Sequence, residues 1–183
     1  MGWLDQIPKA PSLYIGGLHA LYQKPDLFAQ AGITHIVSAL DFDIYEAGAF
    51  QQYEHLHIRL DDDPNENLLA HFSEACKFIE QALEGGGAVF VHCAMGKSRS
   101  ATICCAYLMQ KFGGTPDQAL MWVCEGRPVC DPNPGFKSQL LVWRKMLEAK
   151  GDGEADEIYQ TWLKERWTGD WWSWDKRHRE TKL

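Results

Sequence analysis

The sequence predicts an α/β domain with a central, mostly parallel sheet flanked by helices. Strand-like segments alternate with helix-like segments in the first part of the chain, and only helix-like segments follow. The chain has 183 residues, of which 45% are hydrophobic, so it is long enough to bury a sizeable core. We therefore expect one main domain over residues 1–150 and a helical, tryptophan-rich extension over residues 151–183.

Three segments in the first third of the chain have the character of strands. Residues 12–15 form a short strand candidate before two glycines, and residues 33–40 are rich in β-branched side chains. Apolar and polar side chains alternate over residues 53–60, which predicts a strand with one buried face. A short helix is expected over residues 24–31, and a surface loop over residues 41–50.

Residues 68–84 predict a helix that Asn67 caps at its N-terminus. Apolar residues recur in it at steps of three and four, so one stripe should be buried. This stripe consists of Leu69, Phe72, Cys76, Ile79 and Leu83. Three glycines end the helix, and Ala88–Val91 then indicates a buried strand because it is uncharged and mostly β-prone.

The second half of the chain should be helical. The segment between Arg99 and Lys111 contains no charged residue, so we expect a helix buried at the centre of the domain. Thr115, followed by a proline and by Gln118, has the pattern of an N-cap with a capping box, which predicts the start of another helix. Further helices are expected over residues 135–150 and 154–167.

Composition and charge argue against several classes of protein. No apolar run approaches the length of a membrane span, and the first ten residues lack the apolar core of a signal peptide, so we expect a cytoplasmic or nuclear protein. A net charge of −7 argues against a general nucleic-acid binder. Six cysteines at irregular spacing, several in apolar helical runs, indicate reduced thiols rather than a disulfide framework.

The segment over residues 92–97 joins the predicted strand to the buried helix, and it has the features of an anion site. A loop that leads into a helix aims backbone N–H groups at one point, at the positive end of the helix dipole. Cys93 opens this loop and Arg99 closes it. A thiol in such a site, with a guanidinium beside it, should be a thiolate, which is the nucleophilic form.

The pattern HCxxGxxRS, which starts at His92, is the signature of cysteine-dependent phosphatases, and its place between a strand and a helix is a second match. Here the chain resembles the dual-specificity protein phosphatases over about residues 13–147. The flanking motifs that carry the resemblance are Asn67-Leu68-x-x-x-Phe72 and Pro132-Asn133-x-Gly135-Phe136-x-x-Gln139-Leu140. The resemblance implies a protein tyrosine phosphatase-like fold and the hydrolysis of phosphotyrosine and phosphoserine or phosphothreonine through a phosphocysteine intermediate.

Within this family the chain is most similar to the fungal phosphatases linked to ribosome assembly. The stretch Ile158-Tyr159-Gln160-x-Trp162-Leu163 contributes to this similarity. Those relatives carry a C-terminal zinc-binding domain that this sequence lacks. The chain would then be either a catalytic-domain fragment or a member placed elsewhere in the family.

The chemistry of the loop residues suggests their roles. Cys93 would be the nucleophile, and Arg99 can hold two phosphate oxygens with its planar fork and stabilise the transferring phosphoryl group. Gly96 lets the backbone turn its amides inward. The resemblance implies that Ser100 donates to the cysteine sulfur, and His92 should fix the loop by hydrogen bonding. The phosphate-binding residues would be Ala94, Met95, Gly96, Lys97, Ser98 and Arg99.

The leaving oxygen needs a proton, so a carboxylic acid should lie over the loop. The turn over residues 61–65, which begins with three aspartates, is the obvious source. In the family the acid lies five residues before the asparagine that opens the following helix, and counting back from Asn67 gives Asp62. Asp63 is the next candidate and Asp61 the last, and the alternative is that the three acids simply solvate a turn. The same acid would later act as the base for the water that hydrolyses the phosphocysteine.

We expect neither a metal nor a cofactor. His55 and His57 could suggest a metal pair, but strand alternation puts both on a polar face with no cysteine or carboxylate cluster nearby. Cys104 and Cys105 lie on the buried helix, where one of them could trap an oxidised Cys93 as a disulfide, although plain packing is favoured.

Charge and aromatic residues bear on substrates and partners. Lys97 adds one positive charge to the loop, and acids oppose it at Asp41, Asp43, Glu46 and the aspartate turn, so a phosphoprotein is favoured over a polyanionic ligand. A non-protein phosphate ester, or a phosphatase fold used mainly for binding, are the alternatives. The extension carries tryptophans that should pack back on the domain or else dock a protein partner. These are Trp162, Trp167, Trp171, Trp172 and Trp174.

Overall fold

The computed structural model describes residues 2–44 and 50–180 of the chain. Residues 45–49 of the predicted surface loop, with Glu46 among them, lie outside the described residues. Over the two described ranges, we find no helix with the length and apolar character that crossing a membrane requires.

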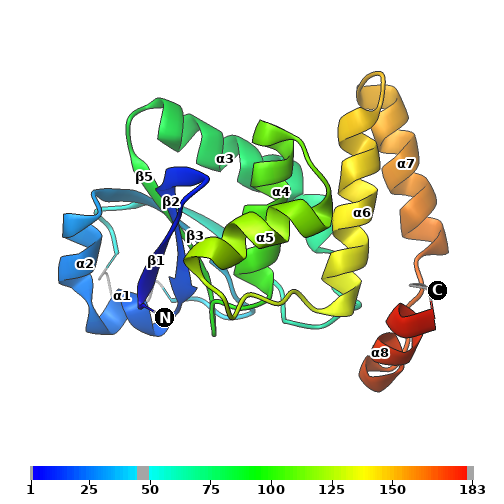
Figure 1. The fold of residues 1–183 in the computed structure, drawn as a ribbon, viewed down its shortest axis with the longest axis horizontal. Helices are drawn as coiled ribbons and strands as arrows, with labels where there is room; N and C mark the ends of the chain where they lie inside the picture. The colour runs from blue at the N-terminus through cyan, green and yellow to red at the C-terminus, as the bar shows by residue number, and fades with distance from the viewer. Residues whose placement is uncertain (1, 45–49, 181–183) are drawn as a thin grey trace.

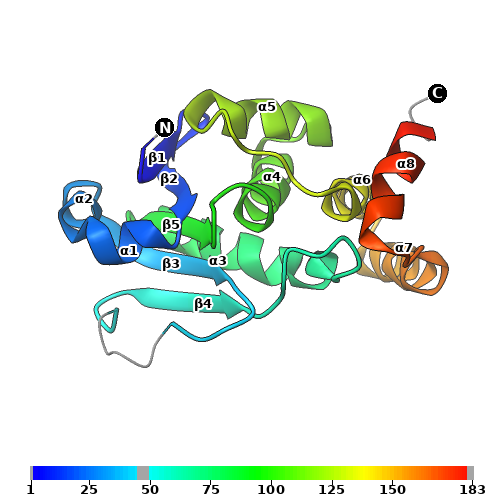
Figure 2. The ribbon, with the colours of Figure 1, turned by 90° about the horizontal axis from the view of Figure 1, so that it is seen from below.

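A five-stranded sheet forms the centre of the described fold, in the order β1-β2-β5-β3-β4 (Figures 1 and 2). The strands are β1 (Leu4–Ile7), β2 (Ala10–Gly17), β3 (Ile33–Ala39), β4 (Glu54–Ile58) and β5 (Ala88–Cys93). Strand β1 is antiparallel to β2, and the pairs β2–β5, β5–β3 and β3–β4 are parallel. The prediction of a mostly parallel central sheet flanked by helices is confirmed.

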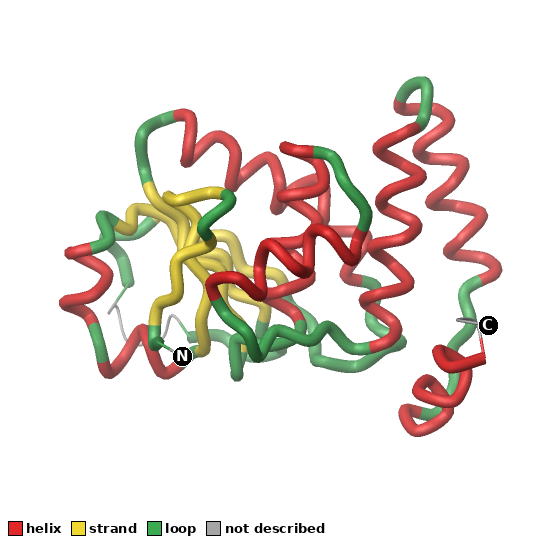
Figure 3. Tube along the Cα trace, viewed as in Figure 1, coloured by secondary structure: helices red, strands yellow, loops and turns green. Residues whose placement is uncertain are grey.

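Helices cover both faces of this sheet (Figure 3). The short helices α1 (His19–Gln23) and α2 (Pro25–Gln30) lie on one side. The helices on the other side are α3 (Phe72–Glu84), α4 (Arg99–Phe112), α5 (Pro116–Gly126) and α6 (Pro134–Glu148). Helix α7 (Asp152–Glu165) runs alongside α6, and α8 (Trp171–Glu180) follows it at the far end from the sheet (Figure 1).

Alternation along the strands divides the core into two apolar layers. Ile36 and Phe90 belong to the smaller layer with Phe28 of α2, whereas Val37 and Val91 belong to the larger layer, which contains α3 and α4. Helix α4 is buried from Arg99 to Met109, as its lack of charged residues predicts. This fully covered helix fixes the segment that precedes it in the chain.

The predicted helix caps are present, with one difference. The Thr115 side chain accepts from the backbone N–H of Gln118, and the Gln118 side chain closes the capping box. Asn67 accepts from the N–H of Ala70, but it caps a 3-10 turn over Leu68–His71 before α3 begins at Phe72. The predicted helix over residues 68–84 therefore begins with a tighter turn.

No local pattern in the sequence predicts β1 or α1. Strand β1 has four residues, of which only Ile7 is buried, so it lacks a period-two pattern and is held by pairing with β2. Helix α1 has five residues, too few to show a helical period. Helix α8 lies within the extension over residues 151–183 that we expected to be helical and rich in tryptophan, and one of its tryptophans, Trp174, is buried.

Candidate active site

The predicted anion loop lies at the carboxyl end of β5, the middle strand of the sheet. We call residues 93–99 the cysteine loop. Its start is beside the end of β2, because Gly17 pairs with Cys93, and the N–H of Leu18 donates to the Cys93 carbonyl at 2.9 Å. Gly96 has a φ of +66°, and a Cβ there would overlap the backbone of Gly16, so the turn needs glycine on both counts.

The Cys93 side chain lies inside this loop. The residue is 1% exposed, and its Sγ accepts from the N–H of Gly96 at 3.2 Å. The buried Ser100 hydroxyl lies 3.3 Å from the same sulfur. A backbone amide and a hydroxyl at this sulfur are the donors that stabilise a thiolate.

Arg99 closes the loop as the first residue of α4, and its guanidinium is buried. Its Nη1 donates to the Leu60 carbonyl at 3.1 Å, which ties α4 to the end of the segment after β4. Its Nε is buried without a hydrogen-bond partner among the described residues. A buried guanidinium N–H needs an acceptor, and a phosphate oxygen suits it.

The three aspartates of the acid turn, residues 61–65, have different surroundings. Asp62 Oδ1 accepts from Ser98 Oγ at 2.6 Å and from Asn133 Nδ2 at 2.9 Å, and its Oδ2 lies 4.0 Å from Arg99 Nε. The Asp61 side chain is 67% exposed, and Asp63 accepts from a backbone N–H within the turn. Among the described contacts of these three aspartates, only Asp62 hydrogen-bonds to the cysteine loop.

Asn133 was not predicted as a site residue, although it stands in one of the motifs that carry the family resemblance. It caps α6 by accepting from Phe136 N–H, and its own N–H donates to Ser98 Oγ at 3.1 Å. The Ser98 hydroxyl is thus engaged with Asp62 and Asn133, which leaves the backbone N–H as the group that Ser98 offers to a phosphate. Met95, which is 74% exposed, and Lys97, which is also exposed, lie at the rim, and Ala94 is half-buried.

Arg127, at the end of α5, is a second site residue that the sequence did not predict. It is buried, and it donates from Nε to the Gly96 carbonyl at 2.7 Å and from Nη2 to the Met95 carbonyl at 3.1 Å. Its Nη1 pairs with Asp5 Oδ2 at 2.5 Å. Arg127 therefore binds two carbonyls of the cysteine loop from behind. No spacing rule marks it, because its partners are distant in the sequence.

His92 is fully buried and takes part in a hydrogen-bonded chain. Its Nε2 lies 2.5 Å from Ser38 Oγ, and the same hydroxyl lies 2.7 Å from Nε2 of His55. Burial lowers the pKa of His92 to about 3 and, together with the charge of His57, the pKa of His55 to about 4. Both rings are neutral at pH 7, and His55 lies half-buried on the polar face of β4, against the Ser38 hydroxyl.

Within the described ranges, no group of three or more histidine, cysteine or acidic residues has an arrangement that could hold a metal ion. Cys104 and Cys105 are fully buried on α4, and burial raises the pKa of both thiols well above its ordinary value. Their surroundings are those of packing residues.

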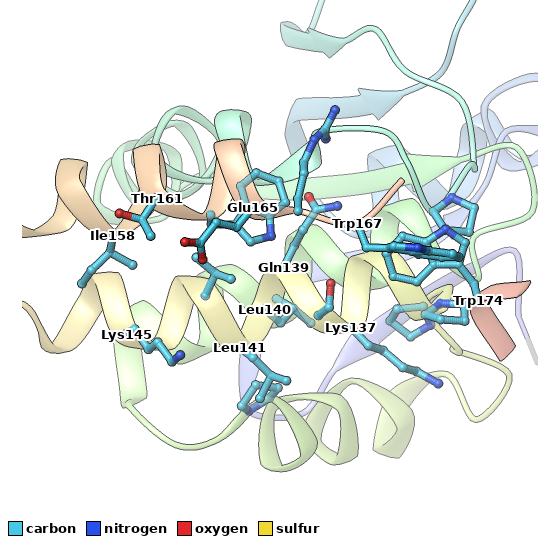
Figure 4. A pocket seen from close by; sticks show the side chains of 18 of the residues that line it. Lys137, Gln139, Leu140, Leu141, Lys145, Ile158, Thr161, Glu165, Trp167 and Trp174 are labelled. Carbon is cyan, nitrogen blue, oxygen red and sulfur yellow. The ribbon is translucent and has the colours of Figure 1, made fainter. Parts of the chain in front are cut away.

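A groove of about 1060 Å³ lies away from the cysteine loop, along α6 and α7 (Figure 4). Ile158 and Leu140 lie along it, and Trp167 and Trp174 stand at one end. Asn65 of the acid turn also lines it, whereas Cys93 and Arg99 do not.

A buried cysteine and arginine in a loop between the central parallel strand and a buried helix define the class of cysteine-dependent phosphatases. The family model described as dual specificity phosphatase, catalytic domain, matches residues 13–146. Dual specificity phosphatase 28 from Homo sapiens is 39% identical over 142 residues, which are 77% of this chain and 78% of that protein. The chain belongs to the dual-specificity phosphatase family and is a protein phosphatase.

Solved structures agree with this assignment. The crystal structure of human DUSP28 has a TM-score of 0.72 at 36% sequence identity and covers 81% of this chain and 97% of that chain. The Yvh1 phosphatase domain from Chaetomium thermophilum has the same TM-score at 34% identity and covers 81% and 99%. A human tyrosine phosphatase-like serine/threonine/tyrosine-interacting protein also has a TM-score of 0.72, at 33% identity, with 80% and 98% covered.

Proposed function

We propose that this phosphatase hydrolyses phosphotyrosine and phosphoserine or phosphothreonine in proteins through a phosphocysteine on Cys93. The observation that carries the proposal is the Cys93 sulfur, which accepts from Gly96 N–H and faces the Ser100 hydroxyl inside the loop that Arg99 closes. In the first step the thiolate attacks phosphorus, the bond from phosphorus to the leaving oxygen breaks, and Asp62 gives that oxygen its proton.

In the second step the Asp62 carboxylate takes a proton from water, whose oxygen attacks phosphorus. The phosphorus–sulfur bond breaks, inorganic phosphate leaves, and Ser100 stabilises the departing thiolate by donating to it. Arg99 and the backbone N–H groups of residues 94–98 bind the phosphoryl oxygens in both steps. His92, held neutral beside Ser38, orients the loop.

Kinetics with aryl phosphates test this mechanism. Chelator-treated wild-type protein should hydrolyse them and be inhibited by vanadate, and Cys93→Ser should lose turnover by about three orders of magnitude or more. Asp62→Asn should lower kcat/KM about 100-fold or more for phenyl phosphate, which has a poor leaving group, and far less for a substrate with a good one. Asp61→Asn and Asp63→Asn are the matched controls. Full activity in Cys93→Ser would contradict the nucleophile, and equal slowing of both substrates in Asp62→Asn would point to another acid.

The proposed substrate class is phosphoprotein. Lys97 is the exposed cation of the cysteine loop, and the exposed Asp61 carboxylate lies 3.9 Å from Arg99 Nη1, so the mouth of the loop carries little excess positive charge to attract a polyanion. A panel of phosphopeptides, phosphoinositides and phosphoglycans decides between this class and a non-protein phosphate ester. Hydrolysis of only the non-protein esters would overturn the proposal.

A link with ribosome assembly in the cytoplasm or nucleus is proposed on the similarity to the fungal phosphatases. Tyrosine-protein phosphatase YVH1 from Saccharomyces cerevisiae is 32% identical over 152 residues, which are 73% of this chain and 42% of that protein. Sedimentation of the tagged protein with pre-ribosomal particles would support the link, and its absence from every such fraction would oppose it.

A second proposed use is protein binding through the extension. Trp171 and Trp172 are 63% and 69% exposed, which is unusual for tryptophan and favours a partner surface. Capture of a defined partner by Cys93→Ser that is lost in Trp171→Ala/Trp172→Ala would support it. Unchanged capture by that double variant would exclude these two side chains.

A further inference from the structure

We infer that residues 166–174 position the general acid of this phosphatase by holding the acid turn through Asn65. The inference rests on the proposed function, because it takes Asp62 as the acid. The family model matches residues 13–146, so the segment lies outside the residues that the model matches. We call Asn65 and its partners Arg166, Gly169 and Trp174 the tail clamp.

Both ends of the Asn65 side-chain amide hydrogen-bond to the tail. Its Nδ2 donates to the Gly169 carbonyl at 3.0 Å, and its Oδ1 accepts from Gly169 N–H at 3.2 Å and from Trp174 Nε1 at 3.1 Å. Its backbone carbonyl accepts from Arg166 Nη1 at 3.0 Å. Four hydrogen bonds therefore join one residue of the acid turn to a nine-residue segment about a hundred positions further along the chain.

The same turn is held on its other side by α6. A Cβ on Gly135 would overlap the backbone of Pro64, so α6 packs directly on the turn. Gln139 Nε2 donates to the Glu66 carbonyl at 2.8 Å. Residues 62–66 are therefore confined between α6 and the tail clamp, and three residues after Asp62 the chain is fixed.

The burial of Trp174, and not of the other two tryptophans of α8, supports a positioning role for the tail clamp. Trp174 is 8% exposed, whereas Trp171 and Trp172 on the same helix stay exposed. The rings of Trp167 and Trp174 pack edge-to-face with 4.8 Å between their centroids. Both rings lie at the end of the groove next to the acid turn (Figure 4). The one buried indole of α8 thus uses its N–H on the acid turn rather than only filling space.

Proton transfer depends steeply on the placement of the acid, and a displacement of about 1 Å can cost on the order of 100-fold in rate. None of the tail contacts touches Asp62 or Cys93 among the described residues, so the tail acts through the backbone of the turn. Loosening the clamp should therefore weaken protonation of the leaving group and leave nucleophilic attack intact.

The test compares substrates by leaving group. In Asn65→Ala and Trp174→Phe we expect kcat/KM for phenyl phosphate to fall about tenfold, and kcat/KM for a fluorinated umbelliferyl phosphate, whose leaving group needs little protonation, to stay within about twofold of the wild-type value. The parameter kcat/KM reports the first chemical step, in which the acid acts. Lys176→Met, an exposed position on the same helix, is the matched control and should show neither effect. Trp174→Phe keeps the aromatic packing, so the comparison does not depend on Asn65→Ala folding.

Three results would overturn the inference. Equal slowing of both substrates in the clamp variants would indicate a loss of general stability, and unchanged kinetics would indicate that the turn holds its place alone. If these occur while Asp62→Asn shows the leaving-group effect, the proposed function stands and only the clamp fails. If Asp62→Asn shows no leaving-group effect, the acid assignment itself fails and the clamp with it.

Discussion

Two glycines in the chain have nearly the same backbone angle and very different surroundings. Gly96 in the cysteine loop has a φ of +66°, and Gly32 after α2 has a φ of +64°. A Cβ on Gly32 would meet nothing within 4 Å, whereas one on Gly96 would overlap the backbone of Gly16 at the end of β2. A Cβ at Gly32 would therefore cost free energy only through the backbone angle, whereas a Cβ at Gly96 would add the cost of steric overlap.

Substitution of each glycine by alanine should therefore give different losses. Gly32→Ala should lower the free energy of unfolding by about 1 kcal/mol, the usual cost of a left-handed residue with a Cβ. Gly96→Ala should cost several kcal/mol more or displace the loop and abolish turnover, because backbone atoms cannot move aside as a flexible side chain can. Urea unfolding and kcat/KM of both variants measure this. Equal losses in the two variants would show that the loop can shift at little cost.

At the scale of elements, Arg127 connects the end of α5 with the back of the cysteine loop. Its guanidinium binds the Met95 and Gly96 carbonyls and the Asp5 carboxylate of β1, so three elements meet at one side chain. Carbonyls held on this side leave the loop amides free to face the anion. The same contact neutralises Asp5, whose side chain is 12% exposed.

We expect Arg127→Met to lower kcat/KM about tenfold or more for good and poor leaving groups alike, because it disturbs the phosphate-binding loop and not the acid. This distinguishes it from the tail clamp variants. The variant should also lose several kcal/mol of stability, since it leaves a mostly buried carboxylate unpaired. Asp5→Asn is the control: it keeps an acceptor for Arg127 and should cost less in both measurements. A leaving-group-dependent effect in Arg127→Met would show that the loop and the acid turn are coupled.

The elements that the sequence predicts correctly are those with a local signal. The all-apolar stretch behind the cysteine loop predicts α4, and the threonine, proline and glutamine pattern predicts the start of α5. Cys93 and Arg99 stand out for the same reason, because their spacing is local. Arg127, Asn133 and Ser38 could not be found in this way, because each acts on a residue 31 or more positions away.

At the scale of the whole molecule, the parallel sheet brings the cysteine loop and the acid turn together. The carboxyl ends of β5 and β4 lie at the same edge of the sheet, so the cysteine loop and the acid turn face each other although 27 residues separate them. Helix α7 then runs back along α6, and its Tyr159 and Trp162 pack against the larger core layer. The extension thereby reaches the acid turn from outside, and Asn67 Nδ2 donates to Tyr159 Oη at 2.9 Å.

The predicted division of the chain at residue 150 has a direct test in a variant that ends at Lys150. We expect it to fold, because the buried members of the larger core layer lie between Ile7 and Trp143. Loss of the partly buried aromatic side chains of the extension should cost a few kcal/mol and lower the melting temperature by about 10 °C. The variant should also show the leaving-group effect expected of the clamp variants, since it lacks every tail contact with Asn65. Insoluble protein would mean that the extension is part of the core, whereas unchanged kinetics and stability with loss of a bound partner would assign it to docking alone.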